Sequence, residues 1–284
     1  MRLSDLTSAG IEEIHRAFID AFSDYDVPLQ LSQDALAEML LRRGYDAASS
    51  VGVYEGDRLV AFTLNGVGQF RGSLTAYDTG TGVCRAYRGK GLTPAMLELA
   101  LSQLAARGVT QYLLEVLTTN EKAERIYRRA GFEIVRELQC WSFEKHTRGE
   151  SRQKSINVVD NLDFEMLSRF MDLEPSWQNS GDSIRRSNEE KLYLTAGENG
   201  RIVGYAVLYP GSGDVPQLAV DHAWRRRGIG RALLIEACSL AEPGRLRLIN
   251  VDDRSKEVRE FLERCGAEPF VRQFEMSRPI VTSI

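Results

Sequence analysis

The sequence is poor in cysteine and histidine, the two side chains that most often bind zinc. Its 284 residues include four cysteines and three histidines. The histidines are isolated and no Cys-x-x-Cys pair occurs, which argues against a metal centre and against a disulfide framework. The cysteines are Cys84, Cys140, Cys238 and Cys265. We therefore expect no metal, and we expect reduced thiols, which favours a cytoplasmic location.

Long hydrophobic runs and an excess of basic residues are also missing. No apolar stretch approaches the roughly 18 residues of a membrane-spanning helix, and residues 1–5 lack the hydrophobic core of a signal peptide. The formal net charge of −4 argues against a protein that binds nucleic acids or anionic membranes. A composition of 43% hydrophobic and 27% charged residues is typical of a globular protein, and the length predicts two domains.

The sequence does contain a short turn that is dense in glycine and basic residues. Residues 84–91 connect an apolar run at 74–83, typical of a strand, with a run of helical period at 92–104. The first backbone N–H groups of such a helix are unpaired and point outward, where an anion can bind. Glycine lets the anion approach the backbone, and Arg88 and Lys90 add positive charge. The turn therefore predicts a site for a pyrophosphate group.

The same arrangement occurs a second time. Residues 222–234 again place a turn rich in glycine and arginine between an apolar run and a helical run. Gly131 and Gly266, which end a later short helix in each half, are separated by nearly the same distance in sequence as the two turns. This regularity predicts an internal duplication. We predict two domains, 1–146 and 155–284, connected by a polar linker at 147–154.

Both turns resemble the acetyl-CoA signature of the GNAT superfamily of N-acetyltransferases, Arg/Gln-x-x-Gly-x-Gly/Ala. The second turn matches in full, from Arg225 to Gly230, whereas the first has the β-branched Thr93 in the last place. The resemblance implies an α/β fold with a mixed sheet, two tandem GNAT domains, and acetyl-CoA as cosubstrate. It assigns cofactor contacts to Val83, Arg88, Gly89, Lys90, Gly91, Leu92, Thr93 and Asn120 in the first half, and to Val220, Arg225, Arg226, Arg227, Gly228, Ile229, Gly230 and Arg231 in the second.

Residues 114–132 are similar to the enzymes of this superfamily that acetylate the N-terminal alanine of ribosomal proteins. The resemblance implies that Tyr127 protonates the departing thiolate, that Asn120 contacts the pantetheine arm, and that Glu115 is the general base. A thiolate of pKa about 8.5 needs a nearby proton donor, and a tyrosine of pKa about 10 can fill that role. Each residue also has a structural alternative: Asn120 as a helix cap, Tyr127 as a packing residue, and Glu115 as a solvent-facing strand residue. Asp78, on the strand before the first turn, is the alternative base.

The second half lacks the residues that the chemistry needs. When Gly266 is aligned with Gly131, Leu262 takes the place of Tyr127, Ser255 that of Asn120, and Asn250 that of Glu115. Leucine cannot protonate a thiolate, so we predict catalysis in the first half. The second half then binds CoA without turnover or has a structural role. A hydroxyl supplied from elsewhere in the second half would overturn this prediction; the candidates are Tyr193, Tyr205 and Tyr209.

The acceptor is predicted from the family. In GNAT folds the first two helices border the amine site, which implies a role for Asp24, Tyr25 and Asp26, and two carboxylates there favour a cationic amine. The alternative is a solvated turn rich in aspartate.

The sequence thus predicts an N-acetyltransferase in which a small-molecule or peptide amine attacks acetyl-CoA directly in a ternary complex. We expect a monomer or homodimer, without nucleic-acid or membrane partners. The rival predictions are a non-catalytic acyl-CoA sensor and catalysis in the second half.

Overall fold

A computed structural model describes residues 1–24, 31–144 and 155–281. Tyr25, Asp26 and the predicted linker lie outside the described residues. The chain forms two compact units. Unit 1 comprises Met1–Val135, Arg185–Ser187 and Phe274–Ile284, and unit 2 comprises Arg136–Ile184 and Asn188–Gln273.

Unit 1 is built on a mixed sheet with the strand order β1-β2-β3-β4-β5-β12. Neighbouring strands from β1 to β4 are antiparallel, and β4 and β5 are parallel, as expected for two strands joined by a helical crossover. The strands are β1 (Arg2–Asp5), β2 (Val51–Glu55), β3 (Arg58–Phe70), β4 (Ser73–Val83), β5 (Gln111–Leu117) and the C-terminal part of β12 (Glu268–Pro279).

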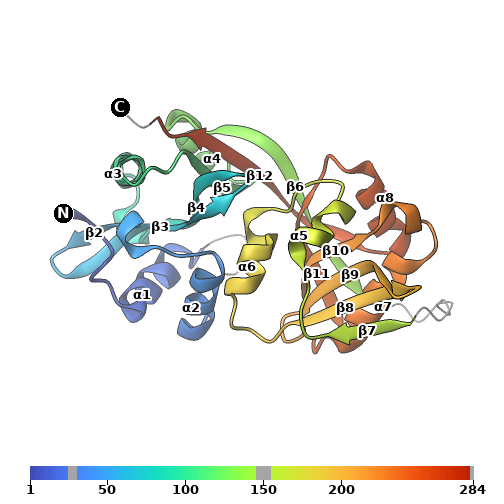
Figure 1. The fold of residues 1–284 in the computed structure, drawn as a ribbon. Helices are drawn as coiled ribbons and strands as arrows, with labels where there is room; N and C mark the ends of the chain where they lie inside the picture. The colour runs from blue at the N-terminus through green and yellow to red at the C-terminus, as the bar shows by residue number, and fades with distance from the viewer. Residues whose placement is uncertain (25–30, 145–154, 282–284) are drawn as a thin grey trace. The chain divides into compact units, whose positions relative to one another are not determined.

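Helices cover both faces of the unit 1 sheet. Figure 1 shows α1 and α2 on one side of the strands and α3 and α4 on the other. Phe18 of α1 stacks on Phe62 of β3 on the first of these faces, and the Ser32 side chain caps the start of α2. The helices are α1 (Ile11–Ala21), α2 (Gln33–Arg42), α3 (Leu92–Ala106) and α4 (Glu121–Arg129), with short 3₁₀ turns η1 (Ala47–Ser49) and η2 (Arg85–Tyr87).

Unit 2 repeats this plan with shorter N-terminal helices. Its sheet has the order β12-β6-β11-β10-β9-β8-β7. The strands are β6 (Glu133–Glu144), β7 (Ile156–Val159), β8 (Leu192–Glu198), β9 (Arg201–Tyr209), β10 (Asp214–Val220), β11 (Arg245–Asp252) and the N-terminal part of β12. The helices are α5 (Phe164–Leu167), α6 (Gly181–Arg186), α7 (Ile229–Leu240) and α8 (Lys256–Cys265), with η3 (Ser168–Phe170), η4 (Trp177–Asn179) and η5 (His222–Trp224).

The last strand of each sequence half lies with the other half. Strand β6, which ends the first half, pairs antiparallel with β11 inside unit 2. The end of β12 belongs to unit 1, where Gln111 donates to Ser277 at 2.9 Å and Arg71 pairs with the buried Glu275 at 3.2 Å. Strand β6 is a single long strand of 12 residues. The compact units are defined by contacts in space. The predicted sequence domains, 1–146 and 155–284, are defined by the internal duplication, and their bounds stay a prediction.

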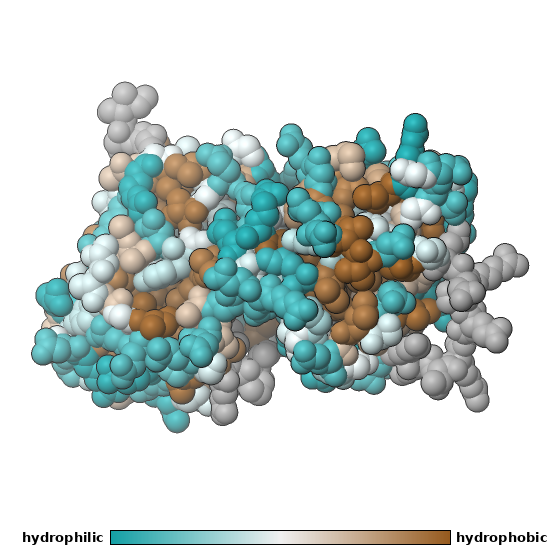
Figure 2. Space-filling model, turned by 60° about the horizontal axis from the view of Figure 1, so that its bottom comes forward, coloured by the Kyte–Doolittle hydropathy of each residue, from teal (hydrophilic) through white to brown (hydrophobic). Residues whose placement is uncertain are grey.

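The surface mixes polar and apolar areas. On the face seen in Figure 2, hydrophobic residues come to the surface in patches and hydrophilic residues cover the areas between them. Among the helices in the described ranges, none is both long enough and apolar enough to cross a membrane.

Candidate active site

Strands β4 and β5 diverge in the middle of unit 1. Their parallel pairing runs from Thr75 opposite Gln111 to Tyr77 opposite Leu113, and both strands continue beyond it. The register of β4 with β3 shifts directly after Asp78, which is the mark of a β-bulge. The bulge turns β4 away from β5. The sheet therefore opens at Asp78, close to the glycine-rich turn that follows β4.

The two glycine-rich turns have the same backbone conformation. Gly89 and Gly91 have φ of 77° and 71°, and the corresponding Arg226 and Gly228 have φ of 61° and 83°. A Cβ at Gly91 or Gly228 would meet no atom within 4 Å, so glycine is needed there for its left-handed backbone and not for packing. The helices that follow begin without a side-chain cap. The first N–H groups of α3 and α7 are thus free of a side-chain acceptor, as an anion cradle requires.

Arg88, the first residue of the signature in unit 1, is directed at protein groups. Its guanidinium donates to the backbone oxygens of Val83 at 3.3 Å and Ala21 at 2.8 Å, and to both carboxylate oxygens of Asp24 at 2.7 Å. These hydrogen bonds lower the pKa of Asp24 to about 2. Arg88 thus fixes the turn to the end of β4 and to the end of α1, and Asp24 is its partner on that side.

Arg225 makes the same contacts in unit 2. It donates to the backbone oxygens of Val220 at 3.0 Å and Phe170 at 2.8 Å and forms an ion pair with Asp172 at 2.7 Å. The arrangement is therefore the same in both units, and in each the arginine fixes the turn to the preceding strand and to the N-terminal part of the domain.

One further basic residue of each turn lies over an aromatic ring. The Lys90 ammonium is 4.8 Å from the centre of the Tyr87 ring, and the Arg227 guanidinium is 4.5 Å from that of Trp224. Such cation–π contacts hold the charge near the turn while leaving it at the surface.

Asp78 and Tyr127 meet at the opening between β4 and β5. The Tyr127 hydroxyl donates to Asp78 Oδ2 at 3.3 Å; Asp78 also accepts from the Thr81 hydroxyl at 2.7 Å and from the Gly80 N–H at 2.9 Å. Asp78 and Tyr127 are only 7% and 8% exposed. Burial raises the pKa of Asp78 to about 6, against the smaller opposing effect of its hydrogen bonds.

Glu115 lies on the opposite face of the sheet from Tyr127. Successive strand residues point to opposite faces, and Leu114 packs in the same cluster as Tyr127. Glu115 accepts a hydrogen bond from the Tyr77 hydroxyl at 3.0 Å, on the face that α1 and α2 cover. The two carboxylates at the opening, Asp78 and Glu115, therefore face different sides of it.

Asn120 and Tyr127 also have the structural roles that the sequence left open. Asn120 Oδ1 accepts from the Ala123 N–H at 3.1 Å and so caps α4. The Tyr127 ring meets the Phe132 ring edge-on, with centroids 5.8 Å apart. These contacts position both residues, and the roles toward a cofactor stay predictions.

A cavity of about 620 Å³ lies in unit 2 beside the second turn. It is bounded by β10, β11, the first turn of α7 and the length of α8, and apolar residues such as Leu218, Val220, Val258 and Phe261 line much of it. Strands β10 and β11 pair at Asp214 opposite Arg247 and then diverge, as β4 and β5 do in unit 1. The volume lies within the range usual for small-molecule and cofactor sites.

Asp78, Glu115 and Tyr127 of unit 1 have apolar or amide counterparts in this cavity. Leu262 and Asn250 line it, as does Val215, which takes the place of Asp78 when the two turns are aligned. Asn250 accepts from Gln273 at 2.7 Å. Among the described residues that line the cavity, none is a tyrosine. Tyr205 is fully buried and donates to Gln217 at 2.9 Å instead.

A short segment that no sequence pattern predicts closes the divergence of β10 and β11. The side-chain amide of Asn179, in η4, donates to the backbone carbonyl of Ile249 in β11 at 2.7 Å. The backbone carbonyl of Asn179 accepts from the side-chain amide of Gln217 in β10 at 2.6 Å. Asn179 is 4% exposed, and the neighbouring Trp177 is 1% exposed. Residues 176–179 carry neither a helical nor a strand period, so the sequence offers no signal for this contact.

Replacing Asn179 by alanine is expected to lower the stability of unit 2. The change removes a hydrogen bond to the half-buried Ile249, which costs about 1 kcal/mol in the free energy of unfolding. Urea unfolding followed by circular dichroism measures the effect. A midpoint equal to that of the unchanged chain would contradict the role of Asn179 as a bridge.

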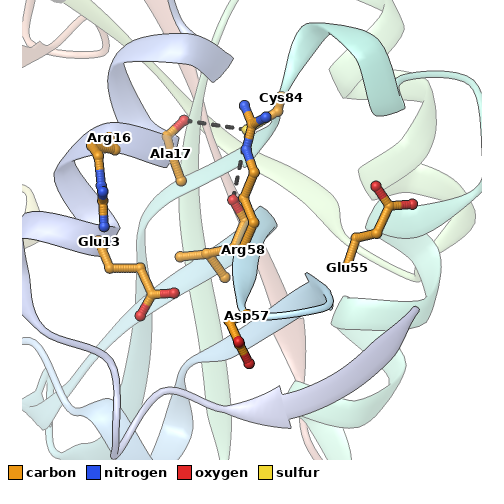
Figure 3. Close-up of a pocket in the computed structure, with 8 residues that line it drawn as sticks. Glu13, Arg16, Ala17, Glu55, Asp57, Arg58 and Cys84 are labelled. Carbon is orange, nitrogen blue, oxygen red and sulfur yellow. Dashed lines mark hydrogen bonds between the residues drawn. The ribbon is translucent and has the colours of Figure 1, made fainter.

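A second cavity, of about 560 Å³, lies in unit 1 between α1 and the β2–β3 hairpin. Figure 3 shows Glu13 and Arg16 of α1 and Asp57 and Arg58 of the hairpin around it, with Cys84 at its inner end. Burial raises the pKa of the Cys84 thiol to about 11, so this cysteine is a poor nucleophile. The residues at the β4–β5 opening do not line this cavity, so it is not the candidate active site.

The acidic, histidine and cysteine side chains of both units are spread apart. In the described part of the chain, no group of three or more of them is placed to hold a metal ion.

Two family profiles match the chain, one in each half. The profile described as Acetyltransferase (GNAT) family matches residues 11–132, and that described as Acetyltransferase (GNAT) domain matches residues 189–266. None of the curated proteins matches the sequence.

Solved structures have the same fold over nearly the whole chain. A GCN5-related N-acetyltransferase from Sphaerobacter thermophilus has a TM-score of 0.72 at 19% identity, and the match covers 100% of this chain and 96% of that protein's chain. A tandem GNAT protein from the clavulanic acid biosynthesis pathway has a TM-score of 0.72 at 14% identity, and the match covers 100% of this chain and 99% of that protein's chain. A GCN5-related N-acetyltransferase from Kribbella flavida has a TM-score of 0.57 at 17% identity, covering 98% and 70%. At these identities the likeness concerns the fold.

These findings confirm the predicted α/β fold with a mixed sheet and two GNAT domains. The likeness of residues 114–132 to the ribosomal-protein enzymes rests on those residues alone and stays a prediction. The chain belongs to the GNAT family of acetyltransferases and carries two GNAT domains in tandem.

Proposed function

We propose that the protein transfers the acetyl group of acetyl-CoA to a primary amine at the β4–β5 opening of unit 1. One observation carries the proposal: a buried carboxylate and a phenol, Asp78 and Tyr127, meet where the sheet opens beside an uncapped helix start. Acetyl-CoA supplies a thioester whose carbonyl carbon accepts the amine. The open surface of Gly91 and the positive charge of Lys90 beside it support binding of the diphosphate at the turn.

The residues around the opening would each serve one part of the reaction. The uncapped N–H groups at the start of α3 hold the diphosphate, with Lys90 beside them. Backbone N–H groups at the end of β4, around Val83, would stabilise the oxyanion of the tetrahedral intermediate. Tyr127 gives its proton to the leaving sulfur. The amine attacks directly in a ternary complex, without a covalent enzyme intermediate.

We propose that the acceptor is a cationic amine held by Glu115. Glu115 lies on the face that α1 and α2 cover, which leaves the opposite face, where Tyr127 lies, for the sulfur. Asp24, which the sequence suggested for this role, is engaged by Arg88 instead. The general-base role predicted for Glu115 stays a prediction.

A screen of acceptors with the full chain tests this function. Thiol release from acetyl-CoA is measured with diamines, monoamines that carry no second charged group, peptides with a free N-terminus, and alcohols. Diamines are expected to react with a KM about tenfold or more below that of the monoamines, because the Glu115 carboxylate pairs with the charge of the second amine. Glu115→Gln should remove most of that preference. If no amine raises thiol release above the rate of hydrolysis, the protein is not an amine acetyltransferase and the acyl-CoA sensor becomes the better proposal.

For unit 2 we propose binding of CoA without turnover. Its turn has the same backbone and the same arginine contacts as that of unit 1, which supports binding. Leu262 and Val215 supply no proton-transfer group, and Asn179 occupies the divergence of the strands, which argues against chemistry.

A further inference from the structure

Two groups that can exchange a proton are in direct contact inside unit 1. Asp78 comes from β4 and Tyr127 from α4, and the phenol donates to the carboxylate at 3.3 Å. Both side chains are more than nine-tenths buried. A base and an acid that lie this close can pass a proton without an intervening water.

The surroundings of Asp78 favour its use as a base near neutral pH. Its own strand supplies the Gly80 N–H and the Thr81 hydroxyl, and α4 supplies Tyr127. The charged Arg43, beyond the end of α2, donates to the Thr79 carbonyl at 2.8 Å and lies near enough to favour the carboxylate. Tyr112 of β5 faces the same space. Burial outweighs these groups and raises the pKa of Asp78 to about 6.

A comparison of the two units distinguishes residues that hold the glycine-rich turn from residues that could transfer protons. Unit 2 keeps the ion pair of Arg88 and Asp24 as Arg225 and Asp172. It has lost Asp78 and Tyr127 together, since Val215 and Leu262 stand in their places. Joint loss is what we expect of two residues that act as one unit, while a cofactor-binding turn is retained.

We propose that Asp78 is the base of the acetyl transfer and that it returns the proton directly to Tyr127. This inference rests on the function proposed for unit 1. The lone pair of the amine forms the C–N bond and the carbonyl electrons move to oxygen; the Asp78 carboxylate takes a proton from nitrogen. The oxyanion electrons then re-form the carbonyl, and the C–S bond breaks with its electrons on sulfur, which receives the Tyr127 proton. The proton on Asp78 passes to the phenolate oxygen, so both residues regain their starting forms.

The pathway makes Glu115 a binding residue. Glu115 accepts from the Tyr77 hydroxyl on the other face of the sheet, away from the face on which Tyr127 packs. It can hold the ammonium group of the acceptor from that face. Asp78 lies at the point where the strands part, in contact with Tyr127, and from there would take the proton of the attacking nitrogen.

The test compares the pH dependence of matched full-chain variants: Asp78→Asn, Glu115→Gln, Tyr127→Phe and the double variant of Asp78 and Tyr127. A base must be deprotonated to act, so kcat/KM of the unchanged enzyme should rise with pH through about 6 and then level. Asp78→Asn should lower kcat by about 10²- to 10³-fold and remove this rise, with the KM for acetyl-CoA changed less than about threefold. Glu115→Gln should keep the rise and raise the KM for the amine.

The double variant and a conservative variant distinguish a chemical role from a structural one. Asp78→Asn combined with Tyr127→Phe should be no more than about threefold slower than the slower single variant, because groups that act as a unit are not additive. Asp78→Glu keeps a carboxylate and should keep the pH-dependent rise even where kcat falls.

Three results would overturn the inference. The first is a full rate with Asp78→Asn, and the second is loss of the pH-dependent rise with Glu115→Gln alone. The third is additive losses in the double variant. Failure of the proposed function looks different, because then the unchanged enzyme also fails to release thiol with any amine.

Discussion

Tyr127→Phe is expected to lower kcat by about 10²- to 10⁴-fold and to leave the affinity for CoA nearly unchanged. The change removes the proton donor of the leaving sulfur, whose contribution is of this size for general acids. The phenyl ring keeps its edge-on contact with Phe132, so the packing of α4 on the sheet is retained. Thiol release gives kcat, and calorimetric titration with CoA gives the affinity.

The second unit provides the matched control for this variant. Leu262→Tyr restores a phenol at the corresponding position of unit 2, where Val215 and Asn250 supply neither carboxylate. In the Tyr127→Phe background it should therefore not restore turnover. Unchanged kcat in Tyr127→Phe, or a rate recovered by Leu262→Tyr, would contradict the assignment of catalysis to unit 1.

Gly91→Glu is expected to lower kcat/KM by about 100-fold or more, whereas Gly228→Glu should change it less than about threefold. Gly91 has φ of 71°, and a left-handed conformation costs a residue with a Cβ about 1–2 kcal/mol. The added carboxylate also repels the diphosphate at the start of α3. Because a Cβ at either glycine would meet no atom within 4 Å, neither change creates a clash at that atom.

The pair of variants decides which unit does the chemistry, because the two glycines share backbone conformation and surroundings. Steady-state kinetics gives kcat/KM, and titration with CoA counts the remaining sites. We expect one site to be lost in each variant if both units bind. Loss of the rate in Gly228→Glu and its retention in Gly91→Glu would assign catalysis to the second half of the chain.

Local features of the fold were predictable because they depend on residues close in sequence. The two turns, the strands before them and the helices after them follow from short patterns, and Ser32 and Asn120 cap helices where their positions predict. The duplication was also visible, since both units keep the same turn. These features are enough to identify an acetyltransferase of the GNAT family.

Long-range pairings were not predictable in the same way. No sequence signal indicates that β6 pairs with β11, or that η4 bridges β10 and β11, because the pairing of a strand depends on partners brought together only by the fold. The same holds for Arg88. Its charge suggested phosphate, but only the tertiary structure places Asp24 against it.

By itself, then, the sequence determined the family, the two glycine-rich turns and the half that retains Tyr127. Those signals are local backbone requirements and single side chains. Only the tertiary structure decided that Asp78 meets Tyr127 while Glu115 turns to the other face. The reason is geometric: alternation along a strand and the bulge after Asp78 fix which side each carboxylate faces, and contact between residues so far apart in the chain arises only when β4 and α4 pack.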